Sequence, residues 1–501
     1  MVEENVIRVK RILEKLAQVR ERGLSCFGSE AHHFRLNAPL SNDEIVRFET
    51  EHDIRLPDDY RAFLEHAGNG GAGPFYGIYP LKKWDDFASW VLEDVPERFL
   101  VLPCPLHPDL EPTADWMEKL DGVSPYQGTL ALGTQGCTYA SLLIVSGPYA
   151  GRVVYVEAGD QPPYMMYEND FLSWYERWLD ELLKGYKTHW FGFGLGGDEE
   201  DFIHILQDSE TSDELKSEAA HALNRLPNLS DSTAKLIPSL LESPIEGVRH
   251  AALAAMGVFH LEDTANQLAI FLNDPSPDIQ RQAINTAMEV NPSRYTDVVL
   301  HKLWETNDKE IATTAYFQLK KAEVLKKPEL LRIIRESASE SLRGLAAYDV
   351  KWAEEDIPLL NQMLLDSYSQ VRSYATLGLR QVKARNSLPQ ILDALSREKD
   401  VHVIGSILKT LGEFGDRNAV PALLEWSESE DDFHRLDAIE ALVKIGDERA
   451  LPQIVAMLGE HRRPERLDPH GFGGMSNSNT ISSLVRKSLK ESPNPAFRGL
   501  A

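Results

Sequence analysis

A short pattern recurs from about residue 198 to the end of the chain, and it constrains the fold more than any other feature. Each copy starts with an apolar residue or histidine, often followed by arginine, and has alanine (isoleucine in one copy) four positions later. From Ala219 onward these landmark positions are 33, 31, 32, 31, 29, 32 and 31 residues apart. A period of this length is typical of stacked helical hairpins. The copies lie at residues 215–219, 248–252, 279–283, 311–315, 342–346, 371–375, 403–407 and 434–438.

The pattern predicts that each copy is the second helix of a hairpin. Its alanines would let this helix pack closely, and a bulkier apolar segment precedes several copies. One hairpin alone has too little core, so only stacking would bury its apolar face. We therefore expect an all-α solenoid over residues 198–501, with about eight helix pairs. The bulky segments are Leu236, Ile237, Leu240 and Leu241; Leu268, Ile270 and Leu272; and Leu359, Leu360, Met363 and Leu364.

An acidic residue stands nine or ten positions before seven of the landmark residues. A carboxylate in the turn before a helix meets the positive end of the helix dipole, so local turn chemistry is one interpretation. Stacking would also align the seven carboxylates along one edge, and such a ridge would suit a basic partner. Both interpretations remain open. The seven are Glu242, Asp274, Glu305, Glu336, Asp366, Glu398 and Glu428.

The last repeat departs from the period, because 46 residues separate Ala438 from the comparable Leu484. The excess predicts a loop insertion near residues 460–479. This segment contains Arg462, Arg463 and Arg466 in an otherwise acidic protein. A long loop on a repeat scaffold is a common interaction site. A disordered insertion is the alternative.

The N-terminal third has a different character. Residues 5–20 have the apolar spacing of an amphipathic helix, Ser41 and Glu44 form a capping-box pair, and Pro57 suits the first position of another helix. A long helix with a heavy apolar stripe is expected over residues 171–186. Between them lie short β-rich segments bounded by Gly or Pro, so the region is predicted to be an α+β domain. The expected strands are residues 75–81, 128–134, 141–147 and 151–157.

A series of short motifs runs through the N-terminal third in a specific order. It consists of Glu44-Ile45, Phe48-Glu49, Leu56-Pro57-Asp58-Asp59-Tyr60, Phe63-Leu64, Asn69-Gly70-Gly71 and Gly77-Ile78-Tyr79, followed by Gly128, Leu130, Leu132-Gly133, Gly136-Cys137, Gly147, Gly151, Val153, Trp174 and Trp178. Through these motifs, residues 30–185 resemble the SUKH superfamily, which includes the yeast cell-wall-assembly regulator domain and many bacterial immunity proteins. The resemblance implies a domain without catalytic residues that binds other proteins through variable surfaces. The later repeats resemble short bacterial-type HEAT units over about residues 198–490.

The chain is therefore predicted to hold a SUKH-like α+β domain at residues 1–190, a Gly-rich linker at 191–197 and HEAT-like repeats at 198–501. The formal net charge is -26. Residues 1–190 hold 30 acidic and 18 basic side chains, and the remainder holds 48 and 34, so both halves are acidic. Such a field repels phosphate backbones and anionic lipids, which argues against nucleic acid or a membrane as the main partner. It would attract a basic protein, although it also simply promotes solubility.

The sequence predicts no catalytic site, no cofactor-binding site and no metal site. Residues 68–73 match GxGxxG, but the segment follows a predicted helix and precedes a predicted strand, the reverse of a dinucleotide-binding loop. His32 and His33 are adjacent, and His461 and His470 lie in the predicted loop. The three cysteines are few and widely spaced, which fits a reducing, cytoplasmic location. We expect no cofactor, no metal and no enzymatic activity.

The leading functional hypothesis, which rests mainly on the SUKH resemblance, is a bacterial immunity protein that neutralises a cognate toxin, and the acidic field predicts that this toxin is basic. An intracellular scaffold or regulator without a toxin partner is the alternative, and an enzyme built on a HEAT frame, such as a DNA-base glycosylase or a bilin lyase, is a third. Glycosylases need a basic face, which the net charge disfavours. Partner-binding residues are predicted among the seven turn acids, with Arg462 and Arg463 in the loop.

Overall fold

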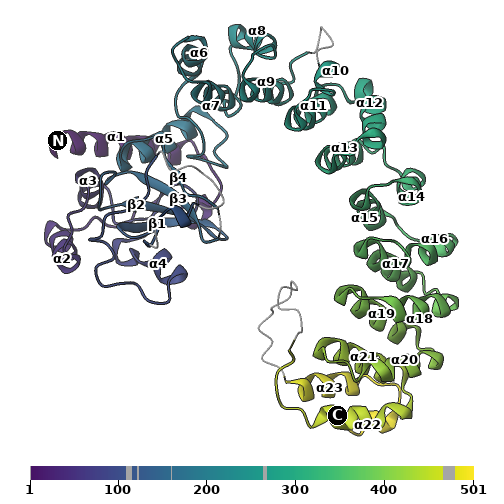
Figure 1. Cartoon of the computed structure of the whole chain (residues 1–501). Helices are drawn as coiled ribbons and strands as arrows, with labels where there is room; N and C mark the ends of the chain where they lie inside the picture. The colour runs from purple at the N-terminus through teal and green to yellow at the C-terminus, as the bar shows by residue number, and fades with distance from the viewer. Residues whose placement is uncertain (1, 109–115, 121–122, 160, 263–267, 466–479) are drawn as a thin grey trace. The chain divides into compact units, whose positions relative to one another are not determined.

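The computed structural model describes residues 2–108, 116–120, 123–159, 161–262, 268–465 and 480–501 (Figure 1). The chain divides into two compact units, Met1–Asn273 (unit 1) and Asp274–Ala501 (unit 2). Unit 1 contains an α+β domain and the first helical repeats, and unit 2 contains the later repeats.

The α+β domain of unit 1 is built on a four-stranded antiparallel sheet in the order β1-β2-β3-β4. Leu130 pairs with Leu143 across the first two strands, and Val154 pairs with both Leu142 and Met165. The three long strands are mostly buried, because helices and loops cover the sheet. The strands are β1 (Thr129–Gly136), β2 (Tyr139–Ile144), β3 (Val153–Glu157) and β4 (Tyr164–Met165).

The helices of this domain begin where local chemistry favours them. Ser41 and Glu44 form the predicted capping box at the start of α2, and Pro57 precedes α3. Asp59 on α3 accepts a hydrogen bond from the backbone N–H of Leu172, 3.0 Å away, which ties α3 to α5. Helix α1 packs beside α5 and α3 (Figure 1). The helices are α1 (Val2–Glu21), α2 (Asn42–His52), α3 (Asp58–His66), α4 (Asp86–Val91) and α5 (Phe171–Lys184), with 3-10 turns at Ser29–Ala31, Leu81–Lys83 and Glu118–Leu120.

One predicted strand, residues 75–81, is wrong. The segment makes an isolated bridge between Gly71 and Ile78 and then joins the sheet through a single bond from the N–H of Tyr79 to the carbonyl of Leu132. Phe75 and Gly77 have φ values of +55° and +94°, which an extended strand does not accommodate. A tight loop therefore replaces the strand.

The apolar stripe predicted on the closing helix forms the centre of the domain core. Trp174, Tyr175 and Trp178 of α5 are at most 1% exposed. The indole N–H of Trp174 donates to the hydroxyl of Tyr155 on β3 over 3.1 Å. Buried Trp and Tyr usually find such a partner, since a lone polar group in a core is costly.

Unit 1 continues into the first repeats. Helix α7 packs against α6 and against α9, so the second helices of consecutive pairs are neighbours. Ser212 and Ser230 cap α7 and α8 through their hydroxyl groups. The helices are α6 (Glu199–Gln207), α7 (Asp213–Leu223), α8 (Asp231–Leu240), α9 (Glu246–Val258) and α10 (Leu268–Phe271).

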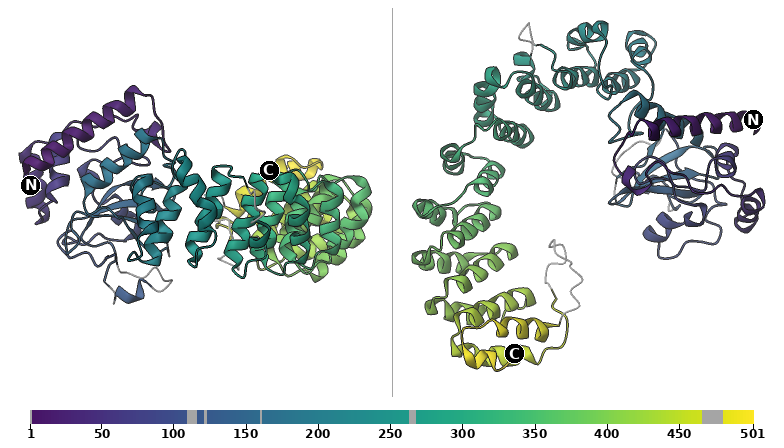
Figure 2. Two further views of the ribbon diagram at one scale, coloured as in Figure 1. Left: turned by 90° about the horizontal axis from the view of Figure 1, so that it is seen from above. Right: turned by 180° about the vertical axis from the view of Figure 1, so that it is seen from behind.

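Unit 2 is a stack of helix pairs. Figure 1 shows α13, α15, α17, α19 and α21 in one row and α12, α14, α16, α18 and α20 in another, and Figure 2 shows the same green-to-yellow stack from other sides. The helices are α11 (Pro277–Val290), α12 (Pro292–Glu305), α13 (Lys309–Lys321), α14 (Lys327–Glu336), α15 (Glu340–Asp349), α16 (Ile357–Met363), α17 (Ser369–Gln381), α18 (Leu388–Arg397), α19 (Val401–Phe414), α20 (Val420–Trp426), α21 (Asp432–Ile445), α22 (Leu451–Leu458), α23 (Ile481–Lys490) and α24 (Pro495–Arg498), with 3-10 turns at Glu354–Asp356, Arg385–Ser387, Arg417–Ala419 and Glu448–Ala450.

The sequence repeat corresponds to the second helix of each pair, as predicted. All eight landmark residues are at most 1% exposed. Six first helices (α12, α14, α16, α18, α20 and α22) carry proline in their first turn, where its missing N–H has no role. The predicted fold class, an α+β domain followed by an all-α repeat region, is confirmed.

Candidate protein-binding surfaces

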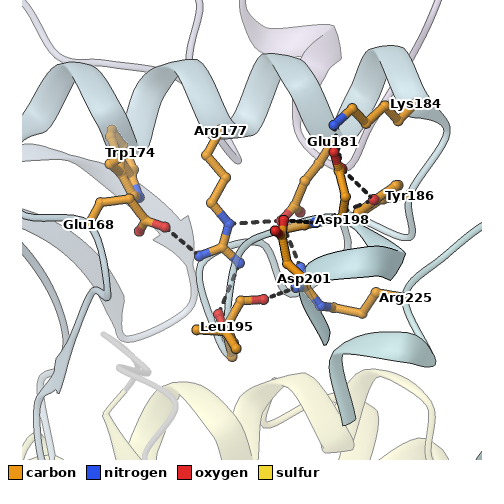
Figure 3. Close-up of polar contacts among 12 residues, drawn as sticks. Glu168, Trp174, Arg177, Glu181, Lys184, Tyr186, Leu195, Asp198, Asp201 and Arg225 are labelled. Carbon is orange, nitrogen blue, oxygen red and sulfur yellow. Dashed lines mark hydrogen bonds and ion pairs between the residues drawn. The ribbon is translucent and has the colours of Figure 1, made fainter. Parts of the chain in front are cut away.

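A buried ion network joins the α+β domain of unit 1 to its first repeat (Figure 3). The guanidinium of Arg177 on α5 donates to Glu181 at 2.8 Å and to Glu168 at 2.7 Å. Arg225, which follows α7, donates to the same Oε1 of Glu181 at 2.8 Å and also to the carbonyl of Leu195. Two cations therefore balance two carboxylates.

The network is held away from water. The side chains of Arg177 and Glu181 are 8% and 4% exposed. Burial by itself lowers the pKa of Arg177, but the adjacent Glu181 and Glu168 outweigh it, and the pKa rises above its ordinary value. Arg177 is therefore charged at neutral pH, and it depends on the buried carboxylates around it for compensation.

The glycine-rich segment predicted as a linker is packed against this network. Phe191 is buried with its ring centroid 5.4 Å from the Arg177 guanidinium. A Cβ on Gly196 would lie 2.7 Å from Nε of Arg177, so only glycine fits there. Asp198, the residue that caps α6, accepts hydrogen bonds from Lys184 and Tyr186. The α+β domain and the first repeats thus share one compact unit, which extends through residues 191–197 to Asn273.

The seven turn acids that the sequence singled out occupy different environments. Glu242, Glu305, Glu336 and Glu428 are exposed. Glu336 pairs with Arg332 at 3.0 Å and Glu305 with His301 at 2.9 Å, each within one helix. Asp274 accepts a hydrogen bond from the backbone N–H of Ser276. Glu242 and Glu428 make no side-chain hydrogen bond or ion pair with any described residue.

Asp366 and Glu398 pair with arginines of the preceding repeat. Arg343 on α15 donates two hydrogen bonds to Asp366, at 2.8 and 2.7 Å, and Arg372 on α17 donates two to Glu398, at 2.7 and 2.8 Å. A third nitrogen of each arginine donates to carbonyls of the turn before its own helix, such as Ser337. These side chains brace one repeat against the next.

The bracing acids are held in the ionised state. Burial alone would raise the pKa of Asp366 and of Glu398, but hydrogen bonds from Arg343 and Arg372 outweigh it, so both pKa values lie below the ordinary range. Sequence reasoning noted these acids and these arginines separately. The signal that it missed is the spacing between each arginine and its acid, which is 23 residues from Arg343 to Asp366 and 26 residues from Arg372 to Glu398.

Arg462 of the predicted loop is also engaged internally. Its guanidinium contacts Asp432 on α21 at 2.8 Å and Glu460 at 3.2 Å, and the Asp432 side chain is only 4% exposed. Arg463 is exposed and makes no side-chain ion pair with a described residue. The predicted insertion, with Arg466 and His470, falls mostly outside the described residues.

The two units differ strongly in charge. Unit 1 contains 44 acidic and 22 basic side chains, a balance of -22, whereas unit 2 contains 34 and 30, a balance of -4. Residues 198–273, the repeats of unit 1, contribute 14 acidic and four basic side chains to this total. The acidic field that the sequence indicated for the whole chain therefore belongs mainly to unit 1.

The glycine motif at residues 68–73 follows α3 and leads into a loop. Gly70 and Gly71 have φ values of +81° and +103°, and an added Cβ on Gly71 would lie 2.4 Å from the carbonyl oxygen of Arg35. Asn69 accepts a hydrogen bond from the N–H of Leu81, which fixes the turn. These glycines permit close backbone packing.

Burial raises the pKa of the Cys26 and Cys104 thiols to about 11. Across the described ranges, no three His, Cys, Asp or Glu side chains are grouped as metal ligands would be. None of the described helices has the length and apolar character required to cross a bilayer.

Residues 39–177 match the SMI1 / KNR4 family (SUKH-1), and residues 356–432 and 388–468 match HEAT repeats. The chain therefore carries a SUKH domain fused to HEAT-like repeats, and both parts support a role in protein interaction.

Solved structures similar to the chain include the Escherichia coli protein YibA, with 18% identity, 50% of this chain and 92% of that chain covered, and a TM-score of 0.34. Kap95p in complex with RanGDP has 11% identity, with 64% and 47% covered and a TM-score of 0.38. Human deoxyhypusine hydroxylase has 15% identity, with 49% and 96% covered and a TM-score of 0.22. TM-scores this low support no conclusion about function. No curated protein matches the chain.

Proposed function

We propose that the chain is a non-catalytic immunity-type protein that captures and neutralises a basic toxin domain through unit 1. The observation that carries the proposal is the charge of unit 1, -22, on a body in which the SUKH domain and the first repeats are joined by a buried ion network. A concentrated negative field accelerates encounter with a basic partner, which suits an inhibitor that must act quickly.

The proposal is consistent with the chemistry of the described residues. Cys26 and Cys104 are buried thiols whose raised pKa keeps them protonated at neutral pH, so they are poor nucleophiles. The three cysteines are unpaired, which fits the reducing cytoplasm where an immunity protein would meet its toxin.

The test is co-expression with toxin domains encoded beside the gene, followed by binding kinetics for the toxin from which the chain protects. A triple variant of exposed acids in unit 1 (Glu200→Gln, Glu214→Gln and Glu242→Gln) is compared with a triple variant in unit 2 (Glu354→Gln, Glu425→Gln and Glu428→Gln). We expect the unit 1 variant to lower the association rate about tenfold at low salt and the unit 2 variant to change it less than about twofold.

The comparison is matched, because both variants remove three charges and because Glu242 and Glu428 stand at equivalent repeat positions. Protection from no neighbouring toxin, together with pull-down of several unrelated cellular proteins, would contradict the proposal and favour a scaffold. Equal rates for the two variants would mean that unit 1 does not direct capture.

A further inference from the structure

Aromatic side chains are exposed in unit 1 where the SUKH domain meets the first repeat. Trp190, which follows α5, is 67% exposed, and Tyr167, which follows β4, is 38% exposed. The ring of Phe193 lies 6.0 Å from that of Trp190 and 5.1 Å from that of Tyr164 on β4. The hydroxyl groups of Tyr164 and Tyr167 are hydrogen-bonded to each other. These four side chains are called here the junction cluster, and exposed aromatic residues grouped in this way are typical of interaction sites.

The junction cluster is anchored to the core and to the buried ion network. The N–H of Gly194 donates to the hydroxyl of Tyr164 over 2.9 Å, and its carbonyl accepts a hydrogen bond from Arg177 over 2.9 Å. The ring of Phe193 lies 5.2 Å from that of Tyr155, which is buried on β3. Because these contacts already fix the side chains, little conformational entropy is lost when a partner binds.

A carboxylate of the first repeat lies beside the junction cluster. Glu218 on α7 accepts a hydrogen bond from the hydroxyl of Tyr167, and an added Cβ on Gly194 would lie 3.6 Å from its Oε2. Among the described residues, no cation is within ion-pair distance of Glu218. Burial raises the pKa of Glu218, and neither Tyr167 nor the charge of Arg225 outweighs this effect. A cation brought by a partner would stabilise this partly buried carboxylate.

The cations of this region do not compensate Glu218. The two arginines of the buried network are balanced by its two carboxylates (Figure 3). The ammonium group of Lys187 lies 5.7 Å from the ring of Phe259, at the end of α9. Residues 198–218 hold nine acidic side chains and one basic side chain, Lys216. Lys216 is two positions before Glu218, so the two side chains do not face each other on α7.

We propose that the junction cluster docks a lysine- or arginine-containing segment of the basic partner, with cationic side chains on the aromatic rings and at Glu218. The identity of this partner rests on the proposed function of unit 1. The face of an indole ring attracts a cation, and more strongly where water is excluded. Glu218 selects the same charge and repels an acidic occupant. The acidic field of unit 1 speeds the encounter, whereas these short-range contacts slow dissociation.

The first arm of the test requires no toxin. Random 12-residue peptides are displayed and selected on the full chain at pH 8, where exposed histidines are neutral. Enriched peptides are then titrated against Trp190→Ala and Glu218→Gln. The matched controls are Trp90→Ala, which removes a tryptophan that is 57% exposed on α4, and Glu65→Gln, which removes a partly exposed carboxylate on α3. Thermal unfolding of each variant checks that it is folded.

The enriched peptides should contain Lys or Arg. Each of the two test variants should raise Kd at least about fivefold, which corresponds to about 1 kcal/mol, and each control less than about twofold. Trp190→Phe, which keeps an aromatic ring, should raise Kd less than Trp190→Leu, which keeps only bulk. Enrichment of acidic or purely apolar peptides, equal Kd values for test and control variants, or equal Kd values for the Phe and Leu variants would overturn the proposal.

The second arm uses the toxin from which the chain protects. Trp190→Ala should raise its dissociation rate at least about fivefold and change its association rate less than about twofold, the reverse of the triple acid variant of unit 1. Unchanged dissociation would overturn the docking site and leave toxin capture intact. If no toxin is found, basic peptides that depend on Trp190 still support the site while the proposed function fails. Self-association of the chain that Trp190→Ala abolishes would overturn the proposal, because the occupant would then be a second copy.

Discussion

The repeats of unit 1 and unit 2 are built from the same kind of helix pair, but their polar side chains make different contacts. Arg249 on α9 and Arg372 on α17 stand at the same repeat position, three residues before the landmark alanine. Both donate to carbonyls of the preceding turn, but only Arg372 also holds a carboxylate of the next repeat, Glu398. The landmark residues that build the stack are thus common to both units, while the polar residues around them are free to vary.

The surfaces of the two units differ because the polar residues around the landmark positions are free to vary. The balance of charge is -22 in unit 1 and -4 in unit 2, although the buried alanines are alike. In a stack of repeats, stability comes from each repeat and its nearest neighbours, so outward residues can change without disturbing the core. One scaffold can therefore carry a strongly acidic unit and a nearly neutral one.

The largest predicted effect concerns the buried ion network of unit 1. Arg177→Met should lower the free energy of unfolding of unit 1 by about 3–5 kcal/mol, because it leaves Glu168 buried without its cation and leaves Glu181 with Arg225 alone. Calorimetry should show the unit 1 transition moving to lower temperature while the unit 2 transition stays in place.

The matched control for the network is Arg55→Met, since the Arg55 side chain is 77% exposed and its pair with Asp58 lies at the surface. Its expected effect is below about 1 kcal/mol. If the two variants lost the same free energy of unfolding, the ion network would not be what connects the SUKH domain to the repeats.

A smaller effect tests the difference between the two equivalent arginines. Arg372→Met should destabilise unit 2 by about 2–3 kcal/mol, because the Glu398 side chain, 4% exposed, loses both of its charged hydrogen bonds. Arg249→Met removes only bonds to backbone carbonyls and should destabilise unit 1 by about 1 kcal/mol. Urea unfolding with calorimetric assignment of each transition measures both values.

A double variant sharpens this comparison. Adding Glu398→Gln to Arg372→Met should restore part of the lost stability, because a neutral amide is cheaper to bury than a carboxylate. If the double variant is less stable than the unmodified protein by the sum of the two single effects, the two side chains do not act as a pair.

The loop arginines provide a third test within unit 2. Arg462→Ala should lower the midpoint of urea unfolding more than Arg463→Ala does, because it removes one of the two guanidinium groups that hold Asp432. The midpoint of urea unfolding measures both. A partner-binding role for Arg462 without any structural role would require the first variant to be as stable as the second.

The smallest effect is a pH dependence that separates the units. Burial lowers the pKa of His32, and burial together with His250 lowers the pKa of His221. The unfolded chain then binds protons more readily than the folded one, so unit 1 should lose stability as pH falls below about 6.5. The lowered carboxyl pKa values of Asp366 and Glu398 in unit 2 remove stability only below about pH 4.

Calorimetry between pH 7.5 and 5.5 tests this difference, and His221→Ala should flatten the response of unit 1. Burial raises the pKa values of Asp59 and Glu218, and these carboxyl groups act in the opposite direction as pH falls. A larger response in unit 2 than in unit 1 would contradict the assignment.

Local signals in the sequence were sufficient for much of the fold. The capping box of Ser41 and Glu44 and the stripe on α5 depend on residues a few positions apart. The repeat is likewise a short motif, which recurs about every 31 residues. Each of these predictions was confirmed. The strand expected at residues 75–81 failed because Gly77 must approach Gly71 so closely that an added Cβ would lie 2.3 Å from its carbonyl oxygen. A pattern of apolar residues does not reveal such an approach.

By itself, the sequence determined that helix pairs repeat after a SUKH-type domain, because helix periodicity and capping are encoded over short distances. Only the tertiary structure decided which charges are available. It paired Arg343 with Asp366 and Arg372 with Glu398 across repeats, packed Gly196 on Arg177, and left Tyr348 exposed. These outcomes depend on which side chains stacking brings within about 3 Å of one another, a distance over which hydrogen bonds form and one that sequence separation does not specify.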